Sequence, residues 1–350
     1  MWLALPAGAD SLDSVELPVA DSSQSALQDA LREGLDTLIV RITGQSAIDG
    51  LPGVDEARED PSRWVSSYHY ESSDRLAARY DLGGLTRFLE VRGAPIWSMP
   101  RPASVIWLVD QGSGQGQLVT RDGPDFAALQ GAARRRGLPL VYPSWDEQDQ
   151  QSLALADIRG RFDDRIADAS RRYQADLTVA AVLYPGSQVR ARWRVLQGDH
   201  SLEQGQSRGA DTDQAIAAMV DDISNALAKR YSVRTGSRED RSELRVQHVA
   251  SLAAWQTLQN YLEDMTGMRQ VQLYQVDGQQ YTFRLDYAAS DSQLRRQLDL
   301  LPQIRACQAP AAEPAQAPSA PADSNGASSQ EQAPATAAQA APPLSYCWQS

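Results

Sequence analysis

The sequence is poor in the residue types on which many active sites depend. Lysine occurs once, as Lys229, and cysteine twice, as Cys307 and Cys347. A Schiff-base mechanism could therefore use only Lys229, and no G-K-[ST] context exists for a phosphate-binding loop. Two cysteines are also too few to define a redox compartment.

Long apolar runs and an excess of positive charge are missing as well. No window approaches the roughly 18 consecutive apolar residues of a membrane helix, so we do not expect an integral membrane protein. The chain carries 45 acidic and 33 basic residues, a formal net charge of −12. Because affinity for phosphates depends on clustered bases, an acidic chain without a basic segment is a poor candidate for binding nucleic acid or an anionic membrane.

The glycine-rich loop Gly112–Gly116 follows the apolar run Val105–Val109, an arrangement seen in many nucleotide-binding proteins. A dinucleotide fingerprint requires a third glycine at the sixth position, opening a helix. Gln117 stands there instead, and the next residues continue as extended chain. We therefore expect a hairpin connection rather than a phosphate cradle.

Other catalytic and metal-binding patterns are equally scarce. His69, His200 and His248 lie in three separate strand contexts, and none has a second ligand at zinc spacing. Neither G-x-S-x-G nor S-x-x-K occurs. Acidic pairs such as Asp163-Asp164 fall on amphipathic helices, where adjacent residues point about 100° apart and do not converge. These patterns favour a protein that is not an enzyme and that uses no cofactor.

Apolar periodicity divides the chain into three small modules of α/β and α+β character with mixed sheets. Residues 13–99 alternate strand and helix patterns around an exposed loop at about 45–62. Residues 102–233 alternate helices with strands and then form a meander, which indicates an α/β sandwich. Residues 242–305 show the order strand, helix, strand, turn, strand and helix, which is typical of a split-βαβ-like module.

The two ends of the chain differ from these modules. Residues 1–12 contain Ala7-Gly8-Ala9 after an apolar start, which we interpret as the back half of a truncated secretory signal. Residues 306–350 are rich in Ala, Pro, Gln and Ser, so we expect a disordered tail. Cys307 and Cys347 are either unpaired or joined in a disulfide. We expect that bond to stabilise little, since the loop it closes is unfolded in the native state too.

The segment Val189–Val195 contains the sharpest candidate for a partner contact. On a strand, Arg190, Arg192 and Arg194 share one face, and Trp193 lies on the other with the apolar residues. Three like charges about 7 Å apart repel one another unless acidic side chains or an anionic ligand neutralise them. These arginines either form a solvated strand face without a specific function or contact a partner.

Four motifs carry a resemblance to a known family: ALQDALREGLDTLIVRITG (26–44), RYDLGGLTRFLEVRGAPIW (79–97), RPASVIWLV (101–109) and ADASRRYQADLTVAAVLY (167–184). Together they resemble a bacterial family known only as domain of unknown function 2066. The resemblance implies a secreted or envelope location in Gram-negative bacteria and no known activity. The middle module is also distantly similar to small α/β domains of periplasmic Tol-system and curli-export assembly proteins, which serve recognition.

Two classes of function follow. The leading hypothesis is a periplasmic or cell-envelope protein that acts by recognising or assembling with envelope proteins, without catalysis. The alternative is an enzyme, or an accessory protein that binds a small molecule or glycan, with a site formed between modules. An enzyme needs titratable groups that converge in one pocket with perturbed pKa values, whereas a recognition module needs an exposed apolar or charged patch.

Overall fold

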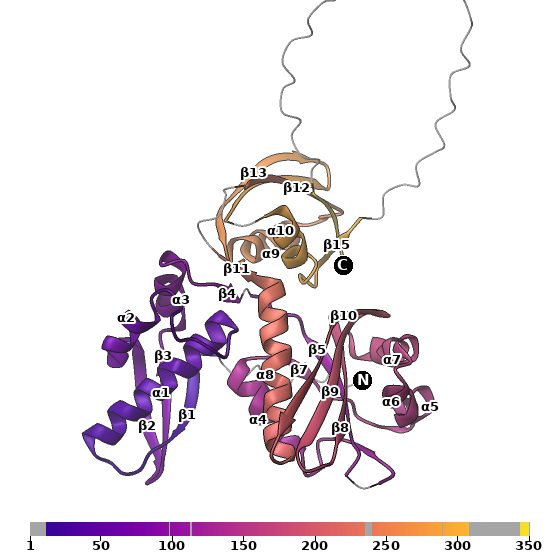
Figure 1. Cartoon of the computed structure of the whole chain (residues 1–350). Coiled ribbons are helices and arrows are strands. Elements are labelled where there is room, and N and C mark those ends of the chain that lie inside the picture. Colours follow the sequence, from indigo (N-terminus) through magenta and orange to yellow (C-terminus); the bar gives the residue numbers. More distant parts are fainter. Residues whose placement is uncertain are drawn as a thin grey trace, which may run out of the picture.

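The computed structural model describes residues 12–97, 99–112, 114–234, 240–288, 290–307 and 344–349. Almost the whole signal-like segment 1–12 lies outside the described residues, so that interpretation stays a prediction. The described chain combines helices with several small mixed sheets in three modules, as the sequence predicts (Figure 1).

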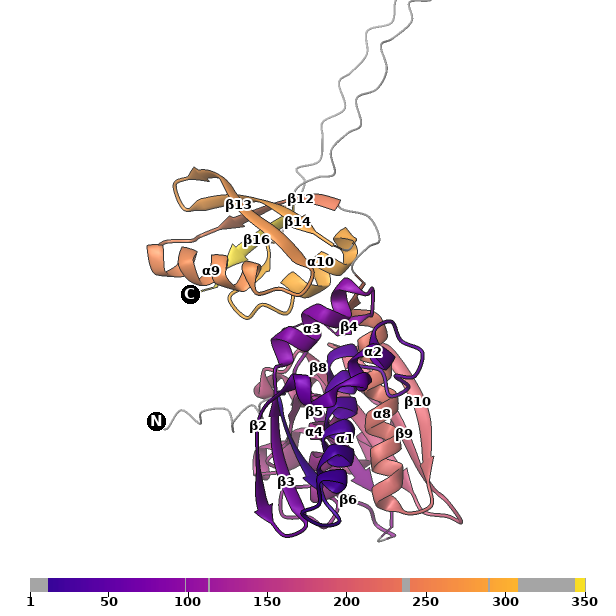
Figure 2. The ribbon, with the colours of Figure 1, turned by 90° about the vertical axis from the view of Figure 1, so that its left-hand side faces the viewer.

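The first module packs helix α1 against a small sheet of strand order β1-β3-β2 (Figure 2). Ser23 caps the start of α1, because its hydroxyl accepts from the amide of Ala26. The expected exposed loop at 45–62 contains a short helix, whose Val54 and Ala57 are buried. The elements are β1 (Ser14–Pro18), α1 (Gln24–Thr43), α2 (Val54–Glu59), the 3₁₀ helix η1 (Pro61–Trp64), β2 (Val65–Ser72), β3 (Arg75–Tyr80), α3 (Leu82–Val91) and β4 (Ile96–Trp97).

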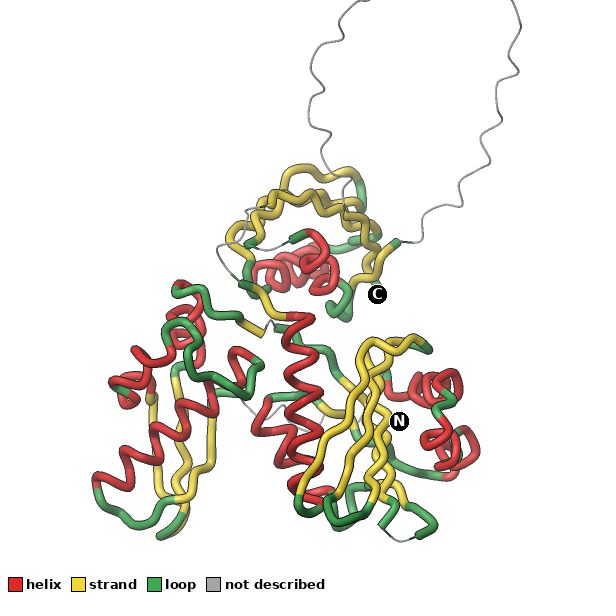
Figure 3. Tube along the Cα trace, in the orientation of Figure 1, coloured by secondary structure: helices red, strands yellow, loops and turns green. Residues whose placement is uncertain are grey.

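The middle module is a sandwich around a sheet of strand order β10-β9-β8-β5-β6, with β7 beside β5. Helices α4 and α8 cover one face and α5 to α7 the other (Figure 3). The elements are β5 (Ser104–Asp110), β6 (Gln117–Leu118), α4 (Phe126–Arg136), β7 (Leu140–Val141), α5 (Glu147–Ser152), α6 (Leu155–Gly160), α7 (Asp163–Ser170), the 3₁₀ helix η2 (Arg171–Tyr173), β8 (Leu177–Tyr184), β9 (Val189–Gln197), β10 (His200–Gly209), α8 (Thr212–Tyr231) and β11 (Ser232–Val233).

Strand β5 explains the continuous apolar run in the sequence. It pairs in parallel with β8 and β7 and is covered on both faces, so every residue from Ser104 to Val109 is buried. The glycine-rich loop after it leads directly into β6, which pairs antiparallel with β5. The hairpin interpretation of this loop is therefore confirmed, and the following helix begins only at Phe126.

The third module contains the expected strand, helix, strand, strand and helix order, extended by two strands. Its sheet has the strand order β13-β14-β12-β16-β15. The elements are β12 (Asp240–Gln247), α9 (Leu252–Glu263), β13 (Met268–Asp277), β14 (Gln280–Tyr287), α10 (Asp291–Leu298), β15 (Ile304–Ala306) and β16 (Leu344–Trp348).

The prediction of a disordered tail over residues 306–350 is wrong at the two ends of that range. Ala306 closes β15, and β16 lies inside the sheet, parallel to β12 and antiparallel to β15. Leu344 and Tyr346 are buried there, because the short run LSYCW alternates apolar side chains toward the helices. Residues 308–343 lie outside the described residues, so the prediction of disorder is untested for them.

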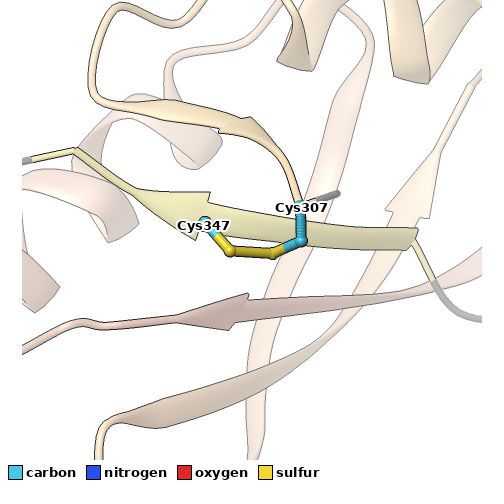
Figure 4. Close-up of a disulfide and its surroundings, with 2 residues drawn as sticks. All are labelled: Cys307 and Cys347. Carbon is cyan, nitrogen blue, oxygen red and sulfur yellow. A yellow bond between two sulfur atoms is a disulfide. The ribbon is translucent and has the colours of Figure 1, made fainter. Parts of the chain in front are cut away.

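A disulfide joins Cys307 to Cys347, next to the β15–β16 pair (Figure 4). The sequence does not decide whether these cysteines pair, and we expect little stabilisation from the bond on the basis of sequence alone. The structure corrects the second expectation, because Cys347 belongs to a strand hydrogen-bonded on both sides rather than to an unfolded loop.

Buried arginines join the first module to the middle one. Arg101 is 8% exposed, stacks on Trp97 and donates to the carbonyl oxygens of Arg41, Arg136 and Gly137. These carbonyls lie at the C-terminal ends of α1 and α4, where unpaired oxygens carry partial negative charge. Burial, followed by the charges of Arg41 and Arg136, lowers the pKa of Arg101 to about 9, so the guanidinium keeps its charge at neutral pH.

The third module is joined to the end of α8 by amide side chains. Gln293 donates to the carbonyl oxygen of Ser232 at 3.0 Å, and Gln297 donates to that of Tyr231 at 3.4 Å. Val233 of β11 belongs to the core of the third module, while β11 also pairs with β4. The three modules therefore meet around the C-terminal end of α8.

Candidate functional site

The three arginines on one face of β9, Arg190, Arg192 and Arg194, differ in whether a helix covers them. Arg194 is only 8% exposed, and its guanidinium donates to Asp163 of α7 at 2.6 Å. Burial lowers the pKa of Arg194, and the charge of Asp163 opposes this shift. Arg194 therefore fastens α7 to the sheet, and its assignment as a partner contact is wrong.

Arg190 and Arg192 are exposed, as the alternation predicts. The guanidinium of Arg192 lies 5.6 Å from the ring centre of Tyr184, and Arg190 faces Arg208 across the β9–β10 ladder. Trp193 packs into the core on the opposite face. A partner contact through Arg190 and Arg192 stays a prediction, because nothing in the structure distinguishes it from a solvated face.

Several carboxyl groups have a raised pKa, but they lie in separate parts of the structure. Burial raises the pKa of Asp125 before α4, helped by the charges of Asp110 and Asp213. Burial also raises the pKa of Glu90 on α3 and of Asp221 on α8, and arginines oppose both shifts. These three perturbed carboxyls share no charged neighbour. Within the described part of the chain, no three His, Cys, Asp or Glu side chains gather as metal ligands.

The free sheet edges differ in how they are protected. Edge strands usually carry charges that prevent pairing with other chains. Strand β2 contains Glu71, and β10 contains Glu203 and Arg208. Strand β13, at the edge of the third sheet, carries Arg269 and Asp277 at its two ends, and the seven residues between them, Gln270–Val276 (QVQLYQV), have no charged side chain. Among these three edge strands, β13 therefore has the longest run without an acidic or arginine side chain.

Strand β13 also exposes large apolar side chains. Leu273 is 38% exposed, Tyr274 52% and Val276 50%. In the ladder with β14, Leu273 faces the buried Phe283 and Val276 faces Tyr281, so both continue the face that forms the core. The core face of the sheet therefore runs beyond the helices that cover it.

Helix α9 contributes to the same surface. The amide of Val249 donates to the carbonyl oxygen of Gln279 at 3.0 Å, which brings the start of α9 to the end of the β13–β14 hairpin (Figure 2). Leu252, in the first turn of α9, is 72% exposed. We call Leu252, Leu273 and Val276, together with the open edge of β13, the β13 surface. Sequence reasoning missed it, although the uncharged run QVQLYQV was a visible signal.

The comparisons with known proteins concern parts of this chain. Residues 7–98 match the family described as "Domain of unknown function (DUF8605)", which spans the first module. That family is uncharacterised, as the resemblance implied, but its number differs from 2066. No curated protein matches the sequence.

Among solved structures, the crystal structure of lipoprotein GNA1162 from Neisseria meningitidis is similar at 15% identity and a TM-score of 0.23. The match covers 37% of this chain and 99% of that chain. A TM-score this low does not define a shared fold. No helix in the described ranges is long and apolar enough to cross a bilayer.

Proposed function

We propose that this chain is a recognition protein of the bacterial cell envelope, without catalytic activity, that binds an extended segment of a partner protein at the β13 surface. In this binding mode the partner adds a strand to an open sheet edge. Main-chain hydrogen bonds supply affinity, and alternate side chains supply specificity.

The observation that carries the proposal is the uncharged run Gln270–Val276 on the edge strand β13, with its exposed apolar side chains Leu273 and Val276. An exposed edge strand with high β-propensity and no charge is prone to pair with another chain. Leu273 and Val276 offer apolar contacts to alternate side chains of an added strand, and Leu252 extends the contact area onto α9. We therefore expect the partner segment to be extended and apolar at every second residue.

The envelope location is supported by the Cys307–Cys347 disulfide, since disulfides persist mainly in oxidising compartments. The pattern Ala7-Gly8-Ala9 agrees with export through a cleaved signal. Processing near Ala9 is the expected outcome. N-terminal sequencing of the protein recovered from cell fractions tests it, and an unprocessed cytoplasmic chain would contradict it.

Photo-crosslinking tests the binding surface. A photoreactive amino acid replaces Val276 in the full chain, and the matched control replaces Tyr68, which is 48% exposed on the edge strand β2. We expect a specific adduct from position 276 alone. The purified partner should then protect the β13 backbone amides from hydrogen exchange, and Val276→Lys should abolish that protection without lowering thermal stability.

Two results would overturn the proposal. An adduct only from position 68 would move recognition to the first module. An adduct between two copies of this chain at position 276 would show that β13 mediates self-association instead.

A further inference from the structure

A groove of about 530 Å³ opens where the three modules meet at the end of α8. Its volume lies within the roughly 300–1,000 Å³ that is typical of small-molecule sites, which often occur between domains. Polar groups from all three modules line it: Gln45 and Ser46 after α1, Lys229 at the end of α8, Ser232 and Arg234 around β11, and Gln293 of α10.

The groove is positively charged in a chain of net charge −12. Among the described residues, no acidic side chain lines the groove, whereas Lys229 and Arg234 both do. Lys229 is the only lysine of the protein, and no described acidic side chain forms an ion pair with it. Its ammonium group therefore has donors to offer to a bound molecule.

Two hydroxyl groups add neutral donors. The Ser232 hydroxyl is buried and has no hydrogen-bond partner among the described residues. The Ser46 hydroxyl accepts from the amide of Asn225 at 3.0 Å, so its own proton is available to a ligand. An unpartnered buried hydroxyl costs free energy, which a ligand acceptor would recover.

Three carbonyl oxygens near the groove that could repel an anion are engaged in hydrogen bonds. Two helices, α1 and α8, end at the groove, and helix C-termini carry partial negative charge. The oxygen of Gly44 accepts from Arg136, that of Tyr231 from Gln297 and that of Ser232 from Gln293.

We infer that this groove binds a small molecule through an oxyanion, a carboxylate or a phosphate group, held by Lys229, Arg234 and the hydroxyls of Ser46 and Ser232. The apolar wall formed by Ala47, Pro95 and Ala228 leaves room for the rest of the ligand. Because the lining comes from three modules, the ligand holds them together. This site is separate from the β13 surface, and neither proposal depends on the other.

Calorimetric titration of the full chain with inorganic phosphate and, separately, with citrate tests the site at constant ionic strength. We expect saturable binding of at least one probe, with a matching rise in melting temperature. Phosphate alone would indicate a phosphorylated ligand, and citrate alone a carboxylic acid. Saturation by neither probe at tens of millimolar would overturn the inference.

Lys229→Gln should weaken binding about tenfold or more, since a charge-assisted hydrogen bond is lost, and Arg234→Gln should act in the same direction. Arg32→Gln is the matched control, because Arg32 is exposed on α1 outside the groove. Equal affinity of Lys229→Gln and the parent chain would show that the anion binds elsewhere.

Discussion

The guanidinium of Arg136 donates a hydrogen bond at 2.6 Å to the carbonyl oxygen of Gly44, the residue that caps the C-terminal end of α1. Arg136 is 2% exposed and comes from α4 of the middle module. Gly44 adopts φ 70°, and a side chain there would collide with Ala228 and Trp97. The close approach of α1 to α8 and the buried arginine together join the two modules.

Replacing Arg136 tests this junction. Arg136→Ala leaves the carbonyl oxygen of Gly44 without this donor and removes one of the two donors of the Asn225 amide oxygen, which keeps the amide of Ser46. We expect a loss of about 3 kcal/mol in the free energy of unfolding, because a buried acceptor then lacks a partner. Chemical denaturation measures it. Arg135→Ala, at the exposed neighbouring position, should stay within about 0.5 kcal/mol of the parent; equal losses in the two variants would contradict the assigned role.

Removing the disulfide should destabilise the third module. The two cysteines are 40 residues apart, so the chain-entropy relation predicts a contribution of about 3–4 kcal/mol. We expect Cys307→Ser with Cys347→Ser to increase hydrogen exchange in β16 before the rest of the sheet. Ser345→Ala, at an exposed position of the same strand, is the control. Unchanged exchange in β16 would show that its packing alone holds it.

The two types of arginine on β9 should respond differently to mutation. Arg194→Ala leaves Asp163 beside the sheet without its partner, so we expect a loss of about 2–3 kcal/mol in unfolding free energy. Arg192→Glu changes an exposed side chain and should cost no more than about 0.5 kcal/mol. If Arg192 contacts a partner, this second variant also loses partner capture while remaining folded. Thermal unfolding and a binding assay separate the two effects.

The ion pair between Asp146 and Arg172 predicts a dependence on pH. Hydrogen bonds from Arg172 and from the amide of Asp149 lower the pKa of Asp146 to about 2. In the unfolded chain, the pKa of an Asp carboxyl is about 4. Because the pKa of Asp146 is lower in the folded protein, its carboxylate stabilises the fold above about pH 4, and this contribution is lost as the pH falls toward 2.

NMR titration of the Asp146 carboxyl measures this shift. In Arg172→Ala, the midpoint should rise toward the ordinary value of about 4. Asp21, which is exposed and whose pKa is lowered by hydrogen bonds from Ser23 rather than by an arginine, serves as a control and should titrate alike in both chains. An unchanged midpoint for Asp146 would assign the shift to its role as the cap of α5 instead.

The sequence by itself determined the elements whose signals are local. The uninterrupted run Val105–Val109 predicts a strand buried on both faces, and β5 is one. Glycine spacing excluded the phosphate cradle, and the pattern of residues 242–305 yielded the order of the third module. In each case the information lies within a few residues, because strand and helix periods and turn residues act locally.

Only the tertiary structure decided what covers each face and which distant segments pair. Period-two alternation assigns Arg192 and Arg194 to the same side of β9, but α7 covers Arg194 and leaves Arg192 exposed. Composition predicts disorder throughout the tail, yet LSYCW forms β16 because β12 and β15 offer partners on both sides. Coverage and long-range pairing depend on contacts between segments far apart in the chain, and local sequence patterns carry no information about those contacts.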